Sequence, residues 1–215
     1  MSRGTDNSPP IAEGRGMLVV VSSPSGGGKG TLIRRVLPTV PGLGYSVSFT
    51  TRDRRAGEID GVHYHFVTPE IFAAMRSEGD FLESAIVHGN FYGTAYSEVR
   101  RELERGRDII LEIDVQGAAS VREKVKNHIS VFILPPSYDV LAARLMNRGS
   151  EQPADLQLRL RNSRAEVEHY REFDYLILND DAEAAAMRLA SIIYAERNRR
   201  ERQEELARRV LSTFN

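Results

Sequence analysis

Short apolar runs alternate with amphipathic stretches along most of this chain. Four strand-like apolar runs recur, at 17–22, 108–114, 129–134 and 174–178, and residues 109–111 and 131–134 are almost continuously apolar. Runs of this kind are typical of parallel β-strands that are covered on both faces. Segments with helical spacing lie between them: 117–126, 137–148 and 154–171. The pattern therefore predicts an α/β fold with a parallel core sheet, built from strand–helix–strand units with right-handed crossovers.

The alternation breaks between residues 44 and 100. Three strand-like segments occur there, separated by polar turns: 46–49, 63–66 and 81–87. A short helix is predicted between the last two, because Thr68 can cap its N-terminus and Pro69 suits its first position. We interpret 44–100 as an inserted, antiparallel-rich subdomain with a ligand surface of its own.

A second irregular piece, 148–164, is rich in Arg, Gln and Asn around Pro153, and we interpret it as a small lid. Residues 1–15 are small, polar and rich in Pro and Gly, which is typical of a flexible tail. The predicted organisation is therefore one domain over 16–215. Apart from the insertion and the lid, its core consists of three stretches: 16–43, 101–147 and 165–215.

The C-terminal region is strongly helical. Three apolar side chains form its predicted core-facing stripe, which extends to about residue 195: Met187, Ile192 and Ile193. Charges of both signs follow up to residue 209, and they favour a solvated helix with ion pairs four residues apart. A dimer contact through Leu206 and Val210 is the alternative.

Composition places the chain among ordinary globular proteins. Of its 215 residues 27% are charged and 41% are apolar, and the net charge of −1 provides no general field for nucleic acid or an acidic membrane. The absence of cysteine excludes disulfides, thiolate zinc sites and a thiol nucleophile. No apolar run approaches the length of a membrane span, and the N-terminus lacks the apolar centre of a signal peptide. We therefore expect a cytoplasmic protein.

A glycine-rich turn lies between the first apolar run and the first helix-like segment. Its sequence from Ser22 to Thr31 is SSPSGGGKGT. Backbone N–H groups of such a turn point at anionic oxygens, and the following helix N-terminus adds partial positive charge. Lys29 can then reach the β- and γ-phosphates. The turn indicates a site for a nucleoside triphosphate, and a glycine turn without a ligand is the alternative.

Two positions of this loop depart from the usual pattern G-x-x-x-x-G-K-[ST]. Ser23 stands where the first glycine is expected, and Gly30 stands where a hydroxyl ligand of Mg²⁺ is expected. The ending Gly30-Thr31 resembles the G-K-G-T of adenylate kinases. That resemblance implies that Thr31 faces the α-phosphate and that Mg²⁺ is held mainly by phosphates and water, so we assign the metal no direct protein ligand.

Arginines gather early in the insertion, where Arg52, Arg54 and Arg55 fall within four positions. The guanidinium group is a planar fork that can bind phosphate through two hydrogen bonds at once. The cluster predicts a second anion site, with a solvated basic turn as the alternative.

Glu83 follows two apolar residues in a predicted strand. A carboxylate in such surroundings needs hydrogen-bond donors. Guanine offers two neighbouring ones, N1–H and the exocyclic N2–H₂, whereas adenine presents an unprotonated N1 that would repel the carboxylate. Such pairing discriminates strongly, because the wrong base leaves buried groups unpaired. An ordinary surface carboxylate is the alternative.

Glu112 and Asp114 come at the end of the second apolar run. Strand alternation would put both on one face, at the carboxyl end where ligand crevices form in open α/β sheets. Carboxylates there can hold Mg²⁺-bound water or a ribose hydroxyl. Two solvent-facing residues at a strand end are the alternative.

In this order and spacing, these segments resemble guanylate kinase, a family of P-loop nucleoside monophosphate kinases. The resemblance covers about residues 16–195 and rests on eight motifs: S-x-P-S-G-x-G-K, S-V-S-x-T-T-R, R-x-G-E, H-Y, F-L-E, G-N-x-Y-G-T, I-D-x-Q-G and V/L-N-D-D. It implies a three-layer P-loop kinase fold with a parallel core sheet, a GMP-binding insertion and a lid. It also implies transfer of the γ-phosphoryl group of ATP to GMP, and to dGMP, with Mg²⁺ as the cofactor.

The resemblance assigns roles residue by residue. The loop would bind the phosphates of ATP: Ser23, Pro24, Ser25, Gly26, Gly27, Gly28, Lys29, Gly30 and Thr31. Asn179 would lie by the adenine. The GMP phosphate would be bound by Arg52, Arg55 and Tyr64, with Tyr92 beside them. The guanine would be read by Ser48, Glu83 and Thr94. Asp114 would sit near the GMP ribose and the phosphoryl path. Three lid arginines would close over the transferring group and, with Lys29 and Asp114, form the catalytic set: Arg144, Arg148 and Arg159.

Two other functions are open to a chain of this kind. One is a non-catalytic guanylate-kinase-like binding module, which is expected to have lost the phosphate loop that this chain retains. The other is a related kinase for another phosphate ester, against which the predicted guanine-reading residues argue. We expect ATP and GMP as partners, with no nucleic acid and no membrane, and the sequence leaves open whether identical chains associate.

Overall fold

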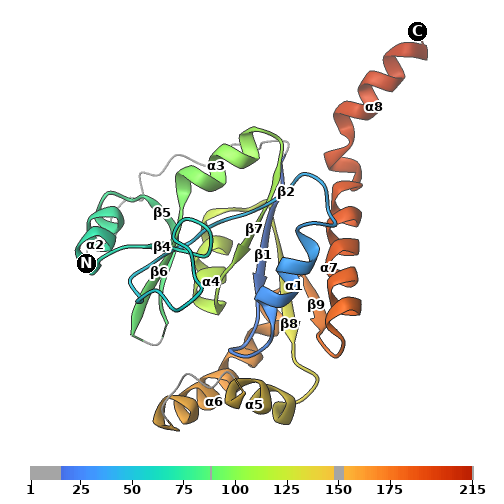
Figure 1. Ribbon diagram of the computed structural model, residues 1–215. Helices are drawn as coiled ribbons and strands as arrows, with labels where there is room; N and C mark the ends of the chain where they lie inside the picture. The colour runs from blue at the N-terminus through green and yellow to red at the C-terminus, as the bar shows by residue number, and fades with distance from the viewer. Residues whose placement is uncertain (1–15, 88, 148–152, 215) are drawn as a thin grey trace.

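The computed structural model describes residues 16–87, 89–147 and 153–214, the side chains of 153–156 excepted. The predicted tail, residues 1–15, and the predicted lid residue Arg148 lie outside these ranges. Figure 1 shows a larger part around one sheet, a smaller part around a second sheet, and a helical arm at the C-terminus.

The core sheet has five parallel strands in the order β2-β7-β1-β8-β9. Their bounds are β1 (Leu18–Ser22), β2 (Leu43–Tyr45), β7 (Asp108–Glu112), β8 (His128–Leu134) and β9 (Tyr175–Leu178). Every residue of the central strand β1 is buried, which explains its continuously apolar sequence. The parallel α/β core predicted from the apolar runs is confirmed. The run predicted over 108–114 was too long, because Asp114 leaves the strand to cap the next helix.

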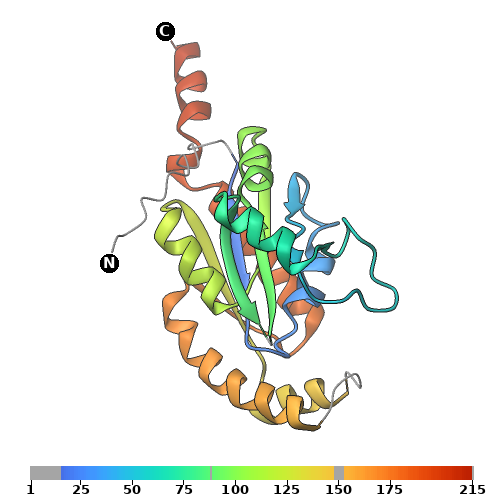
Figure 2. The same ribbon diagram turned by 90° about the vertical axis from the view of Figure 1, so that its left-hand side faces the viewer.

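Helices cover both faces of this sheet, which confirms the predicted three layers (Figures 1 and 2). α1 (Lys29–Val36) and α7 (Ala182–Arg197) pack on one face. α3 (Tyr96–Glu104) and α4 (Val115–Lys124) pack on the other. α5 (Tyr138–Met146) and α6 (Pro153–Glu168) lie at the carboxyl end of the strands, and the 3₁₀ turn η1 (His169–Glu172) leads from α6 to β9. The strand ends therefore face a space bordered by α6.

The second sheet has four strands in the order β4-β3-β6-β5, with two antiparallel pairs and one parallel pair. Its elements are β3 (Phe49–Thr50), β4 (His65–Phe66), α2 (Pro69–Ser77), β5 (Phe81–Val87) and β6 (Asn90–Ala95). The Phe72 ring stacks on Phe81 at 4.5 Å between centroids and fixes α2 against the sheet. The predicted cap is confirmed, since the Thr68 side chain accepts from the backbone N–H of Ile71.

Two predicted boundaries of the insertion fall inside elements. β2 pairs with β7 in the core sheet, so the boundary at residue 44 cuts a core strand. The boundary at residue 100 lies within α3, whose buried face packs on the core. The described part of the predicted lid is also regular, because α6 is one continuous helix that extends beyond residue 164 to Glu168.

The predicted core-facing stripe of the C-terminal helix is wrong at Met187, which is 59% exposed. The face of α7 that meets α1 is set by small residues, Ala185 and Ala186, which allow the two helices to approach closely. The stripe continues through Leu189 and Ile193, which are fully buried.

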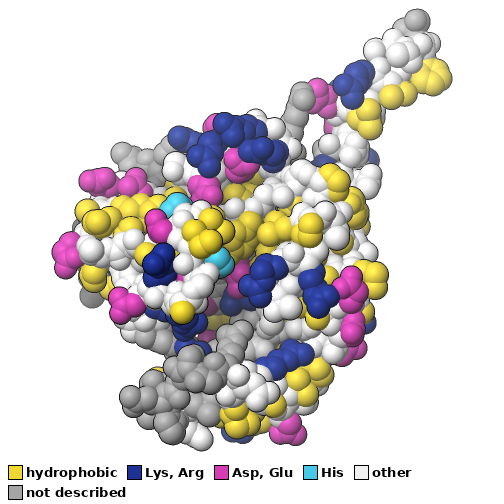
Figure 3. All heavy atoms as spheres, viewed as in Figure 1, with side chains coloured by type: hydrophobic (Ala, Val, Ile, Leu, Met, Phe, Trp, Pro, Cys, Tyr) yellow, Lys and Arg dark blue, Asp and Glu magenta, His cyan; other side chains and the backbone are white. Residues whose placement is uncertain are grey.

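Beyond α7 the chain forms an arm that projects from the body (Figures 1 and 2). It consists of η2 (Arg200–Arg202), α8 (Glu204–Leu211) and η3 (Ser212–Phe214). Glu204 and Arg208 form an ion pair four residues apart, as predicted, at 3.5 Å. Leu206 and Val210 are about half exposed, and Figure 3 shows apolar side chains along the arm. The dimer contact through them stays a prediction.

Candidate functional site

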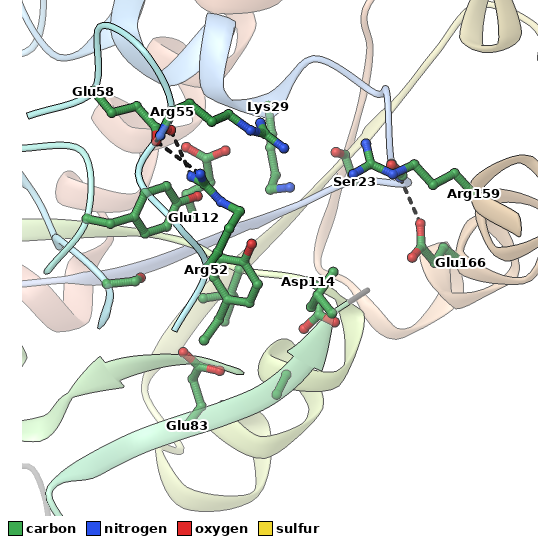
Figure 4. A pocket seen from close by; sticks show the side chains of 17 residues that line it. Ser23, Lys29, Arg52, Arg55, Glu58, Glu83, Glu112, Asp114, Arg159 and Glu166 are labelled. Atoms are coloured by element: carbon green, nitrogen blue, oxygen red, sulfur yellow. Dashed lines mark hydrogen bonds and ion pairs between the residues drawn. The ribbon is translucent and has the colours of Figure 1, made fainter. Parts of the chain in front are cut away.

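A pocket lies where the carboxyl end of the core sheet faces the second sheet (Figure 4). This is the edge at which open α/β sheets bind ligands. The predicted site residues that line it are Ser23, Ser25, Lys29, Ser48, Arg52, Arg55, Tyr64, Glu83, Tyr92, Asp114 and Arg159. Glu58, Ala85, Val87, Glu112, Ile113 and Glu166 complete the lining. Side chains from the loop after β1, from both sheets and from α6 thus converge on one space.

The loop between β1 and α1 has the geometry of an anion cradle. Gly26 and Gly28 have φ angles of 85° and 91°, a region in which L side chains are strained. Gly28 is the N-cap of α1 and no side-chain hydrogen bond caps the helix, so the first N–H groups can face a ligand. Lys29 opens the helix and reaches the pocket. The predicted succession of strand, glycine turn and helix is confirmed, and the helix begins earlier than its apolar residues indicated.

The side chain of Asn179 is hydrogen-bonded to this loop. Its Nδ2 donates to the carbonyl oxygen of Gly27 at 2.8 Å. Arg144 on α5 in turn donates to the backbone carbonyl of Asn179 at 3.0 Å. A Cβ at position 28 would lie only 2.4 Å from the Asn179 amide nitrogen, so the glycine permits this contact. The amide of Asn179 thus contacts the loop itself, and its place beside adenine stays a prediction.

The three predicted lid arginines lie at different places. Arg159 projects from α6 into the pocket lining. Arg144 lies behind the loop, and its Nη1 is buried with no hydrogen-bond partner among the described residues. Arg148 is outside the described residues. The structure therefore brings one of the three to the pocket and a second to the phosphate loop.

Helix α6 is bonded directly to the phosphate loop. The Ser25 backbone N–H donates to Glu166 Oε2 at 2.7 Å, and the Ser163 hydroxyl donates to the Ser25 carbonyl at 3.2 Å. Burial raises the pKa of Glu166, while the Ser25 N–H and the charge of Lys29 act in the opposite direction. Neither Ser163 nor Glu166 was predicted from the sequence. The one feature that could have indicated them is their spacing of three residues, which places both on one face of an otherwise polar helix.

Glu83 lies on β5 with its carboxylate buried, 3% of the residue being exposed. The Thr94 hydroxyl donates to Oε1 at 2.5 Å. Burial raises the pKa of Glu83 to about 7, although the bond from Thr94 lowers it. A Cβ on Gly117 would lie 2.6 Å from Oε2, so α4 closely approaches the acid only because this residue is glycine. Ser48 also lines the pocket, so the predicted guanine-reading residues lie in and beside one space.

Arg52 is held at the mouth of the pocket by Glu58. Its Nη1 and Nη2 donate to the two carboxylate oxygens at 3.0 and 2.8 Å, and the Arg55 backbone N–H donates to the same carboxylate at 2.8 Å. The bonds from Arg52 hold the pKa of Glu58 below its ordinary value. Tyr64 lies under the guanidinium at 5.4 Å and meets Tyr92 edge-on at 5.8 Å. The predicted anion-binding group is therefore brought together, with Glu58 orienting its first arginine.

Asp114 and Glu112 both line the pocket, although they do not share a strand. Asp114 is the N-cap of α4, and its Oδ1 accepts from the Gly117 N–H at 2.9 Å. Glu112 ends β7 and accepts from the Tyr45 hydroxyl at 3.2 Å. No pattern around Tyr45 pointed to this contact, because its partner lies 67 residues away.

The described residues contain neither a membrane span nor a cluster of metal-ligating side chains. No helix there is long and apolar enough to cross a membrane. No group of three or more His, Cys, Asp or Glu in the same part of the chain is arranged to hold a metal ion.

The chain is similar to guanylate kinases along most of its length. The family model described as guanylate kinase matches residues 15–196. A guanylate kinase of Agrobacterium fabrum is 46% identical over 199 residues, which cover 92% of this chain and 90% of that protein. A guanylate kinase of Chelativorans sp. is 49% identical over 193 residues, covering 89% and 88%. The crystal structure of guanylate kinase from Anaplasma phagocytophilum matches with a TM-score of 0.74 at 34% identity, covering 87% of this chain and 89% of that one.

Proposed function

Because the chain belongs to the guanylate kinase family, we propose that its pocket brings GMP on the second sheet against ATP on the phosphate loop. The protein is an ATP-dependent nucleoside monophosphate kinase that transfers the γ-phosphoryl group of ATP to GMP. One observation carries the assignment of sites. The same pocket is lined by Lys29 from the phosphate-loop region, Arg52 from the arginine cluster and Glu83 from β5. Figure 4 shows the lysine and the two insertion residues around a common opening.

Glu83 is the residue that selects guanine. Its buried carboxylate accepts from Thr94 through one oxygen and has lone pairs left for the N1–H and N2–H₂ of guanine. Ser48 lines the same pocket, and we assign it to O6 of guanine. Adenine cannot supply these donors, so it would leave a buried carboxylate unpaired. dGMP differs only at the ribose and is expected to be a substrate too.

Arg52, Arg55, Tyr64 and Tyr92 bind the phosphate of GMP. Three of the five N–H donors of Arg52 bond to Glu58 and to the carbonyl oxygen of Asp53, which leaves two to offer a phosphate. The aromatic rings of Tyr64 and Phe66 lie 5.4 and 5.7 Å from the guanidinium and restrict its movement. An acceptor phosphate would thus meet a preoriented donor.

Transfer requires no protein base, because the acceptor oxygen of GMP is already anionic near neutral pH. Catalysis then consists of in-line positioning and charge neutralisation. Lys29 and the loop amides hold the ATP phosphates, and Arg159, Arg144 and Arg148 act on the transferring group. Asp114 lies near the GMP ribose and the phosphoryl path, and Asn179 near the adenine. Closure of the insertion, 44–100, and the lid, 148–164, excludes water and suppresses hydrolysis of ATP.

Mg²⁺ is the expected cofactor, and the donors in the pocket suit it. Glu112 and Asp114 supply hard carboxylate oxygens beside Lys29. When bound with ATP, the ion neutralises charge on the phosphates during transfer. The ion would be held mainly by phosphate oxygens and water, and the two carboxylates would bind that water. We also place the reaction in the cytoplasm, as a step of purine nucleotide metabolism.

A panel of nucleoside monophosphates with ATP, followed by release of ADP, tests the substrate assignment. GMP should be used at least 100-fold more efficiently than AMP or UMP, in keeping with the discrimination of buried hydrogen-bonding sites. Comparable efficiency with AMP would contradict the role of Glu83. No ADP release with any acceptor would favour a non-catalytic binding module, although the retained Lys29 and loop glycines argue against one.

Substitution of Lys29 tests whether the pocket has separate sites for the ATP phosphates and for GMP. Lys29→Met should nearly abolish turnover and leave GMP binding within about threefold, because the lysine serves the ATP phosphates. Lys126→Met, at an exposed position after α4, is the matched control and should behave like the unaltered protein. Equal losses of turnover and GMP affinity in Lys29→Met would refute the assigned role.

A further inference from the structure

Gly30 is the second residue of α1, and nothing in its backbone requires glycine. Its φ angle is not among the positive ones of this chain, and glycine in a helix costs roughly 1 kcal/mol relative to alanine. The reason for a glycine must therefore lie in the space that a side chain would occupy. This position is also the one at which related phosphate loops carry a hydroxyl for Mg²⁺.

The carboxylate of Glu112 fills that space. A Cβ built on Gly30 would lie 3.0 Å from Glu112 Oε1 and 3.2 Å from Oε2. Such contacts are tighter than nine in ten real Cβ contacts, so a side chain at position 30 would shift the carboxylate by a few tenths of an ångström. The oxygens of Glu112 thus border the space that the side chain of a serine or threonine would enter.

The surroundings keep Glu112 directed at this place. It ends β7, and its backbone is paired with Val21 of β1, two residues before the phosphate loop. The Tyr45 hydroxyl donates to Oε2 at 3.2 Å. Burial and the charge of Glu112 raise the pKa of Tyr45, so the phenol stays protonated and acts as the donor. Lys29 and Asp114 line the same part of the pocket.

We propose that Glu112 replaces the missing hydroxyl as the protein group that holds nucleotide-bound Mg²⁺, and that Gly30 and Glu112 form a matched pair. The inference rests on the proposed function, since it assumes that the loop binds a Mg²⁺–nucleotide. A carboxylate is a hard, charged oxygen donor that suits Mg²⁺ well. The proposal departs from the expectation that the metal has no direct protein ligand.

A matched pair predicts that restoring the hydroxyl alone is harmful. Gly30→Ser would shift the carboxylate and crowd it with a hydroxyl, whereas Glu112→Asp shortens the acidic side chain by one methylene group and leaves room. The two changes should therefore be strongly non-additive, as expected for side chains in contact. Without the pairing, Gly30→Ser would add a ligand and strengthen metal binding.

Calorimetric titration of ADP in Mg²⁺ and in EDTA tests this directly, because the ratio of the two affinities measures the contribution of the metal. Glu112→Gln should reduce that ratio about tenfold or more, without weakening ADP binding in EDTA. Gly30→Ser should reduce it to a similar degree, and Gly30→Ser/Glu112→Asp should return it to within about threefold of the unaltered protein. Glu104→Gln, at an exposed position on α3, should leave it unchanged.

Two results would overturn the proposal: an unchanged ratio in Glu112→Gln, or an increased ratio in Gly30→Ser alone. If Glu112→Gln fails to fold, which thermal denaturation without ligand will show, the Gly30→Ser single and double variants decide the question. ATP:GMP transfer by the unaltered protein is assayed separately. Its absence would refute the proposed function, whereas the ADP titration reports on the metal site alone.

Discussion

The carboxylate of Glu166 accepts a hydrogen bond from the backbone N–H of Ser25 at 2.7 Å. The Ser163 hydroxyl, one turn earlier on α6, donates to the carbonyl of the same residue at 3.2 Å. Both backbone polar groups of Ser25 are therefore held by α6. The position of the helix that carries Arg159 is linked to the shape of the loop that carries Lys29.

Loss of the Glu166 carboxylate should loosen the phosphate loop. Glu166→Ala is expected to raise KM for ATP about tenfold, the equivalent of one charge-assisted hydrogen bond, with little change in KM for GMP. Glu166→Gln keeps an acceptor oxygen, so its KM for ATP should lie between those of the unaltered protein and Glu166→Ala. Steady-state kinetics with each substrate varied provide the measurement, and Glu168→Ala, exposed on the same helix, is the control. A parallel rise in both KM values would point to general misfolding instead.

GMP affinity should depend on pH through Glu83. Burial raises the pKa of Glu83 to about 7, while the two donors of guanine require the ionised carboxylate. Below pH 7 binding must release the proton, so the affinity should fall by up to tenfold per pH unit as the pH decreases. Above about pH 7 it should level off. Binding titrations between pH 5.5 and 8.5 provide the measurement.

Guanosine and Glu83→Gln are the controls for this pH dependence. The phosphate of GMP titrates near pH 6, and guanosine lacks it, so a slope shared by both ligands belongs to the protein. The slope should vanish in Glu83→Gln, which also binds more weakly because the amide cannot accept from both donors. A flat profile for guanosine with the unaltered protein would contradict the assignment.

The buried carboxyl group of Glu83 should also lower the stability of the folded protein in the absence of ligand. Its pKa is raised from an ordinary value of 4.5, so the folded state binds the proton more tightly than the unfolded state does. Stability is therefore lost as the pH rises from about 4.5 to 7 and stays low above that range. Glu83→Gln should be more stable than the unaltered protein at pH 8, by at most about 3 kcal/mol, and similar to it near pH 4.5. Thermal denaturation at both pH values tests this, and equal melting temperatures at pH 8 would contradict it.

Glu58 should affect KM for GMP and not KM for ATP. It accepts two hydrogen bonds from Arg52 and orients a group that binds the acceptor phosphate. Glu58→Gln replaces the charged acceptor by an amide that can face only one of the two donors, and KM for GMP should rise about tenfold. KM for ATP should not change. A decrease in KM for GMP would show instead that Glu58 competes with the phosphate for Arg52.

Local patterns in the sequence were sufficient for most of the core and for individual site residues. The strand predicted over 81–87 matches β5, because its apolar residues are bounded by turns. The helix start at Thr68 was predictable because a cap acts within three residues. Asp114 shows the limit of such patterns, since its alternation with Glu112 fitted a strand while its side chain caps α4.

Contacts between distant segments were not predictable from one sequence. Glu166 and Ser25 are 141 residues apart, and neither lies in a pattern that points to the other. Met187 was assigned to the core by helical spacing, but the buried face of α7 is set by the close fit of alanines against α1. Packing of this kind depends on the partner surface, which the sequence of the helix does not contain.

Removal of one partner from the ion pair between Asp108 and Arg197 should destabilise the protein far more than the same change in a surface pair. Asp108 is 6% exposed. Its Oδ2 accepts from Arg197 Nε at 2.6 Å and its Oδ1 from the Met17 N–H at 2.8 Å, so it joins β7, β1 and α7. Removal of the arginine leaves a buried carboxylate without its charged partner, and Arg197→Ala should cost about 3 kcal/mol.

Arg35→Ala is the matched control, because Arg35 and Glu183 form an ion pair whose side chains are 46% and 68% exposed. That substitution should cost less than about 1 kcal/mol, since solvent screens the pair. Urea unfolding of both variants and of Arg197→Ala/Asp108→Asn gives the comparison. The double variant should recover part of the loss, because Asn carries no charge and can still accept from the Met17 N–H. Similar costs for the Arg35 and Arg197 variants would mean that burial adds nothing to the inner pair.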